Sequence, residues 1–166
     1  QMCIRDSCMT EDSIRKYHGT GEKMPQQHLP LIAMPTTAGT GSEVTCVSVL
    51  TNHAEGKKSP IVSDGFYPTL ALIDPELTYS MPPGVTASTG IDVLCHALEG
   101  FWSKGHQPVC DALARHACRI VFTYLERACM DGKDKEAREK MAEASVIAGM
   151  AFTLPKTTAS HACSFP

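Results

Sequence analysis

The order of hydrophobic patterns is the feature that most constrains the fold of this chain, because strand-like runs come first and helical patterns follow. Residues 29–79 alternate short apolar runs with turn residues, a pattern typical of strands. The strands predicted here span residues 29–35, 45–51, 59–63 and 69–74. After Pro82-Pro83 the apolar period lengthens to that of a helix. This separation predicts two domains or layers rather than one alternating βαβ sheet.

The second half predicts three long helices and the start of a fourth. The long helices are expected over residues 86–103, 108–130 and 135–154. Asp134 is the expected N-cap of the third, and Pro155 is expected to end it. The apolar stripe expected on the first helix consists of Ile91, Leu94, Cys95 and Leu98. The fourth helix is expected to begin near residues 157–160, and neither half contains the elements of a complete domain. We therefore expect a central part of a longer protein, in which residues 1–8 match no element and are a candidate artefact.

Composition excludes several functions. There are 15 Lys and Arg residues against 18 Asp and Glu residues, with a net charge of −3, so no basic excess is present to bind nucleic acid. No apolar run approaches the ~20 residues of a membrane span, and the N-terminus lacks the apolar core of a secretion signal. The eight cysteines include no C-x-x-C pair, which disfavours a zinc ribbon. Reduced thiols in a cytoplasmic protein are the expected state.

Asp92 and His96 form the strongest local pattern for chemistry. They are four residues apart on a predicted helix, so both point from the same face and can reach one divalent cation. An ordinary ion pair on a solvated face explains the same spacing equally simply. His161 becomes a third candidate ligand only if another group needs it, and His106 and His116 are expected to be structural.

The loop PTTAGTGSEVT, at residues 35–45, follows a predicted strand. Its small residues allow close approach of a ligand to the backbone, and its hydroxyl groups can bind phosphate or ribose oxygens. It is neither a G-x-x-x-x-G-K-[ST] loop nor a G-x-G-x-x-G loop. A flexible surface turn would have the same composition.

Three segments together resemble a known family. PTTAGTGSEVT, ALIDPELTYSMPPGVTASTGIDVLCHALEG and ASHACSFP occur in this order and resemble the iron-containing (group III) alcohol dehydrogenases from about Leu29 to Pro166. The resemblance implies an α/β plus all-α fold, in which an N-terminal dinucleotide-binding α/β domain is followed by a helical metal-binding domain. Residues 1–83 would be the C-terminal part of the first domain, and residues 84–166 the N-terminal part of the second.

The resemblance also implies a set of site residues. The implied metal ligands are Asp92, His96 and His161. The implied contacts with the nicotinamide cofactor are Thr36, Thr37, Thr45 and Lys58. The family's fourth ligand, a histidine, would lie beyond Pro166. Phe165 stands where the family often has a further histidine, so no proton-relay role is assigned there.

The implied activity is hydride transfer between a small alcohol or aldehyde and NAD or NADP, assisted by Fe²⁺ or alternatively Zn²⁺ acting as a Lewis acid. The family commonly forms homo-oligomers, and the chain alone is expected to be inactive. Three alternatives stay open at this point: a dehydroquinate synthase-like lyase, a glycerol dehydrogenase-like enzyme and a non-enzymatic helical module.

Overall fold

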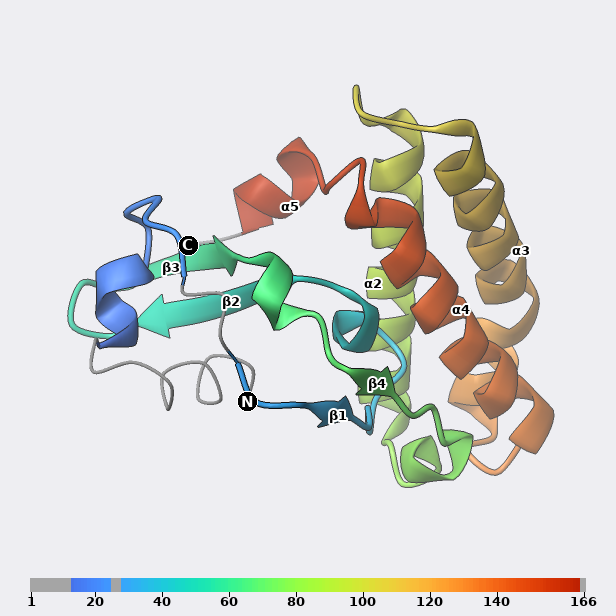
Figure 1. The fold of residues 1–166 in the computed structure, drawn as a ribbon. Coiled ribbons are helices and arrows are strands. Elements are labelled where there is room, and N and C mark those ends of the chain that lie inside the picture. Colours follow the sequence, from blue (N-terminus) through green and yellow to red (C-terminus); the bar gives the residue numbers. More distant parts are fainter. Residues whose placement is uncertain (1–12, 25–27, 165–166) are drawn as a thin grey trace.

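A computed structural model describes residues 13–24 and 28–164 of the chain (Figure 1). The predictions made for residues 1–8 and for Phe165 lie outside these ranges. Two small sheets and a block of helices make up the described part (Figure 1). The expectation of α/β plus all-α elements is confirmed.

Both sheets are two-stranded. Strand β1 (Ile32–Ala33) pairs in parallel with β4 (Leu70–Ala71), whereas β2 (Val47–Asn52) pairs antiparallel with β3 (Lys57–Val62). All four predicted strands are present, but β1 and β4 contain only two residues each. The start of the third predicted strand was wrong, because β3 begins at Lys57, two residues before the predicted start at residue 59. Cross-strand pairing of Asn52 with Lys57 leaves a short turn, in which Gly56 adopts a φ of +62°.

Four short 3-10 helices precede, separate or follow these strands in the described part of the chain. They are η1 (Ile14–Tyr17), η2 (Ser42–Val44), η3 (Asp64–Phe66) and η4 (Pro75–Thr78). Beneath the β2–β3 hairpin lies a small core of Tyr17, Met24, Cys46, Ile61 and Phe66. This core is separate from that of the helices.

The helical half consists of α2, α3, α4 and α5. Their bounds are Pro83–Trp102, Pro108–Met130, Lys135–Thr153 and Ala159–Ser164. Helix α2 begins before the predicted residue 86, since a proline is well suited to the first helical turn. The carboxylate of Asp134 accepts a hydrogen bond from the backbone N–H of Ala137, which confirms the predicted cap of α4. Within the described ranges, no helix is long and apolar enough to cross a membrane.

The predicted apolar stripe of α2 was right at Leu94, which packs against the helical core, and wrong at Ile91. Ile91 is 49% exposed, while Gly90, Val93 and Ala97 are buried against the neighbouring helices. A Cβ atom at Gly90 would lie 2.2 Å from Cδ1 of Leu125 on α3. Small residues therefore decide which face is buried, because they let the helix backbones approach closely.

The small-residue loop of residues 35–45 is packed against α4. The backbone N–H of Gly39 donates to the hydroxyl of Ser145 at 2.9 Å. Gly41, at φ +59°, lies so close to Gly149 that a Cβ on Gly41 would be 2.7 Å from the Cα of Gly149. Because both residues at this contact are glycines, the loop backbone can pack directly on α4. The loop is therefore not a free surface turn.

This contact generates a stability prediction. A Cβ at Gly149 would lie 2.7 Å from Cγ2 of Val44 and 2.9 Å from the carbonyl oxygen of Gly41. We expect Gly149→Ala to destabilise the full-length protein by about 1–3 kcal/mol through overpacking. The measurement is the thermal unfolding midpoint.

Gly84→Ala is the matched control, because nothing lies within 4 Å of a Cβ built there. Stability should be unchanged or higher by up to about 1 kcal/mol. Equal midpoints for the two variants would contradict the close packing of the loop on α4.

Candidate metal and cofactor site

Asp92, His96 and His161 converge from two helices. Oδ2 of Asp92 is 3.8 Å from Nδ1 of His96, and Oδ1 of Asp92 is 3.5 Å from Nε2 of His161. One ligand atom from each residue can be chosen so that all three lie within 4.8 Å of one another. Ligands about 2.0–2.2 Å from a common cation are roughly 3–4 Å apart. Both distances from Asp92 to the histidines fall in this range, so the three side chains lie within reach of one divalent metal ion after small side-chain rotations.

The His96 ring is held in a stack. It packs against Phe152 at 4.4 Å between ring centroids and against His161 at 4.6 Å, with interplanar angles of 19° and 20°. Its Nδ1 atom is buried and has no hydrogen-bond partner among the residues described. A buried polar atom without a partner is costly, and a metal ion would satisfy it.

Burial lowers the pKa of His96, although the charge of Asp92 opposes this shift. The neighbouring His161 lowers the pKa further. The imidazole is therefore neutral near pH 7, which leaves a nitrogen lone pair available for a metal.

Glu99 orients the third ligand. This carboxylate is 1% exposed, and its Oε1 lies 2.5 Å from Nδ1 of His161. A carboxylate only accepts hydrogen bonds, so Nδ1 carries the proton and Nε2 keeps the lone pair that faces Asp92. Burial by itself would raise the pKa of Glu99, but hydrogen bonds from His161 and Thr158 hold it below its ordinary value.

Sequence reasoning missed Glu99, although the position carried a signal. It follows Asp92 by seven residues and His96 by three, so all three side chains lie along the same face of α2. With one carboxylate oxygen and two imidazole nitrogens, the donor set suits Fe²⁺ or Zn²⁺. A carboxylate behind a ligating histidine is the usual support of such a site.

The other two histidines lie in separate pairs. Nδ1 of His106 is 3.0 Å from Asp111, and Nε2 of His116 is 3.6 Å from Glu143 on α4. Both rings are more than half exposed, which agrees with structural roles. The carboxylate beside His116 was not visible at helical spacing because it comes from another helix.

The three converging residues line a cleft of about 840 Å³. Its walls come from the loop of residues 40–45, the β2–β3 hairpin, α2 and the segment that links α4 to α5. In Figure 1, α5 lies between the hairpin and α2. Phe152 and the aliphatic residues Val47, Val49 and Val62 contribute apolar surface to the cleft.

The predicted cofactor residues divide into two pairs. Thr45 and Lys58 line the cleft. Thr37 lines a separate small cavity that Glu43 also lines, and Thr36 lines neither the cleft nor that cavity. Contact of Thr36 and Thr37 with a cofactor stays a prediction. Two hydroxyl residues that sequence reasoning did not select, Thr40 and Ser42, also line the cleft.

Lys156 has an unusual backbone. Its φ of +65° is in the left-handed region, where no other non-glycine residue of the described ranges lies. This conformation costs about 1–2 kcal/mol for a residue with a Cβ. Lys156 also lines the cleft, and strain of this kind is concentrated at functional sites.

Comparison with known proteins identifies the family. A model of the family described as iron-containing alcohol dehydrogenase matches residues 4–75, and a model of the C-terminal part of the Fe-containing alcohol dehydrogenase family matches residues 86–166. The chain belongs to the iron-containing alcohol dehydrogenase family.

Individual relatives are similar over most of this chain. The crystal structure of sulfoacetaldehyde reductase from Bifidobacterium kashiwanohense in complex with NAD+ is 69% identical with a TM-score of 0.96, covering 98% of this chain and 43% of that one. The NAD-dependent methanol dehydrogenase of Bacillus methanolicus is 43% identical over 84% of this chain and 36% of its own length. The sulfoacetaldehyde reductase of Bilophila wadsworthia is 41% identical over 92% of this chain and 39% of its own length. The chain thus spans less than half the length of these relatives.

The role of Glu99 can be tested by metal affinity. We expect Glu99→Ala in the full-length protein to weaken metal binding about 10- to 100-fold, because His161 loses its orienting partner. Glu99→Gln should have an intermediate effect, since its amide oxygen still accepts a hydrogen bond. Competition with a chelator measures the affinity.

Glu143→Ala is the control, because this carboxylate pairs with His116 and Lys140 on α3 and α4. It should bind metal as tightly as the unaltered protein. Unchanged affinity in Glu99→Ala would show that His161 does not depend on this carboxylate.

Proposed function

We propose that the full-length protein is a metal-dependent oxidoreductase that transfers a hydride between NAD and a small aldehyde or alcohol. The observation that carries the proposal is the shared cleft, into which the three candidate metal ligands and Thr45 and Lys58 all face. Family membership supports hydride transfer as the reaction class. A non-enzymatic helical module would have no need to bring the carboxylate of Asp92 and the imidazoles of His96 and His161 together from α2 and α5.

The metal site is proposed to consist of Asp92, His96 and His161 from this chain. When bound, a divalent cation supplies Lewis-acid polarisation of a carbonyl oxygen. Iron is favoured over zinc by the family to which the chain belongs. Asp92 contributes negative charge to the site, Glu99 fixes the tautomer of His161, and the ring of Phe152 stacks on one face of His96.

The cofactor is proposed to be NAD rather than NADP. The NAD+ complex of the 69% identical reductase and the NAD-dependent methanol dehydrogenase support this choice. Thr45 and Lys58 are the proposed contacts that line the cleft, and Thr36 and Thr37 remain proposed contacts outside it. The only charged residue of the loop is Glu43, which is buried, and burial raises its pKa against an opposing backbone hydrogen bond. The loop therefore presents mostly uncharged groups to the cofactor.

Sulfoacetaldehyde is the proposed substrate. Two relatives are named sulfoacetaldehyde reductase, and one of them is 69% identical to this chain over the part that aligns, which is 43% of that relative. The reaction would move a hydride from NADH to the carbonyl carbon and a proton to the oxygen. Net consumption of one NADH per aldehyde separates this proposal from a dehydroquinate synthase-like lyase, which returns its cofactor unchanged. Lack of NAD-dependent oxidation of glycerol would separate the proposal from a glycerol dehydrogenase.

The domain division and the state of the whole protein are further parts of the proposal. We assign residues 1–83 to the dinucleotide-binding domain and residues 84–166 to the helical domain, supported by two hydrophobic clusters, one of which lies before residue 84 and the other of which, Ala38 aside, lies in the helices. The full-length protein is proposed to be a cytoplasmic homo-oligomer. The six cysteines of the described ranges are unpaired, as expected in a reducing compartment.

Loss of a metal ligand should abolish turnover. We expect Asp92→Ala and His161→Ala to reduce NADH-dependent aldehyde reduction at least about 10³-fold, because metal polarisation contributes several kcal/mol. Absorbance of NADH measures turnover, and elemental analysis of the purified variants measures metal. His106→Ala is the matched control, since this exposed ring pairs with Asp111 away from the cleft. Full turnover in either ligand variant would refute the proposed site.

Cofactor contacts should appear in the KM for NADH. We expect Lys58→Ala to raise this KM roughly 10- to 100-fold and Thr45→Val about 3- to 10-fold, in line with the loss of a charged and a neutral hydrogen bond. Lys57→Ala is the control, because successive side chains of β3 point to opposite faces. A matching rise in Lys57→Ala would mean that the effect is one of general charge on the hairpin.

A further inference from the structure

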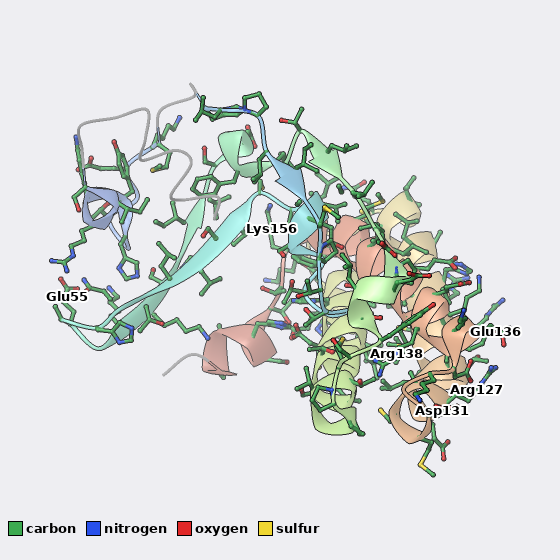
Figure 2. The ribbon with its side chains drawn as sticks, turned by 90° about the horizontal axis from the view of Figure 1, so that it is seen from below. Glu55, Arg127, Asp131, Glu136, Arg138 and Lys156 are labelled. Carbon is green, nitrogen blue, oxygen red and sulfur yellow. The ribbon has the colours of Figure 1, made fainter. Side chains whose placement is uncertain are left out.

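We propose that Lys156 binds the anionic end of the substrate and thereby selects an aldehyde that carries a sulfonate group. This inference rests on the function proposed above and deepens it, because it assigns a specificity-determining residue of this chain. Figure 2 shows Lys156 between the β2–β3 hairpin and the helical block, on the wall of the cleft that also contains His161.

The segment that carries Lys156 is firmly held. Its backbone N–H donates to the carbonyl of Phe152 at 2.8 Å. On one side, the hydroxyl of Ser103 donates to the carbonyl of Pro155 at 2.7 Å. On the other side, the backbone N–H and the hydroxyl of Thr158 both donate to the buried carboxylate of Glu99. The base of the lysine side chain is therefore fixed relative to α2, which carries two of the three candidate ligands.

The need to link α4 to α5 does not by itself explain why a lysine has this strained backbone. A sharp link between α4 and α5 at φ +65° suits glycine, which adopts this conformation without a steric penalty. Lysine retains that strain and adds a long cationic side chain at the edge of the cleft. Strain that persists beside a candidate site is consistent with a functional requirement for the side chain.

The charges of the cleft leave Lys156 available for a ligand. Its formally charged residues, histidines aside, are Lys58, Asp92, Glu99 and Lys156. Asp92 faces the two histidines, and Glu99 is occupied by Thr158 and His161. Lys58 lies on the opposite hairpin wall. For the ammonium group of Lys156, no hydrogen bond or ion pair is present within the described ranges.

A sulfonated aldehyde matches this arrangement. One methylene group separates its sulfonate from the carbonyl carbon, so the anionic end stays close to the reacting end. Lys156 precedes His161 by five residues, and the short segment that holds them presents a cation beside the proposed metal ligands. An ammonium group acts as a point charge on a flexible stem, which suits a compact, permanently ionised sulfonate.

The test compares two aldehydes of similar size in the full-length, metal-loaded enzyme at saturating NADH. Sulfoacetaldehyde carries the anion, and propanal does not. We expect Lys156→Gln to lower kcat/KM for sulfoacetaldehyde at least about 10-fold, mostly through KM, as for loss of a charged hydrogen bond. For propanal, kcat/KM should change less than about twofold. Lys156→Arg should restore most of the activity on sulfoacetaldehyde.

Two further variants separate charge from strain. Lys156→Gly relieves the backbone strain and should fold at least as well as the unaltered enzyme, yet it should lose the same selectivity as Lys156→Gln. Lys133→Gln, at an exposed position between α3 and α4, should leave kcat/KM unchanged for both aldehydes. Recovery of sulfoacetaldehyde activity in Lys156→Gly would assign the effect to strain and overturn the proposal.

The remaining outcomes distinguish this proposal from the proposed function. If Lys156→Gln lowers kcat/KM equally for both aldehydes, or raises the KM for NADH, Lys156 is not the anion site. If the unaltered enzyme reduces propanal and sulfoacetaldehyde equally well, the oxidoreductase assignment stands and the anion site is refuted. If it reduces no aldehyde or alcohol with either nicotinamide cofactor, the proposed function itself fails.

Discussion

The hydrogen bonds of Glu99 are the interaction on which the rest of the site depends. This buried carboxylate on α2 accepts from Thr158 and from His161, and it thereby fixes the start of α5 on the last turns of α2. An ionised carboxylate with so little exposure would be strongly destabilising without such partners. The requirement to satisfy it brings His161 beside Asp92, and it also fixes the segment that carries Lys156.

Close packing of small residues forms the opposite wall. Gly39 and Gly41 lie against α4 near Ser145 and Gly149, so the loop of residues 35–45 borders the same cleft as the helices. Larger side chains on either side would separate the two surfaces, because protein interiors have little spare volume. Two distant parts of the sequence therefore share one cleft through a contact between glycines.

The cleft combines groups of different polarity in a way that suits the binding of a small polar molecule. Apolar side chains from the hairpin and Phe152 line it beside a cluster of one carboxylate and two imidazoles. A mostly apolar lining with a few convergent polar groups is the general form of a small-molecule site. The pKa of His96, lowered by burial, keeps its imidazole neutral, which is the form that binds metal.

Local sequence determined the helices, the approximate strands and the candidate pair on α2, because these follow from periodicity, capping and i, i+4 spacing. The resemblance added His161, whose spacing to the pair carried no signal. Tertiary structure alone decided that small residues such as Gly90 and Ala97, rather than Ile91, form the buried face of α2. It also decided that Thr40 and Ser42 line the cleft while Thr36 and Thr37 do not, and that Glu99 supports His161. These features depend on contacts between residues far apart in the chain, and no periodicity within one segment encodes which distant side chain will meet it.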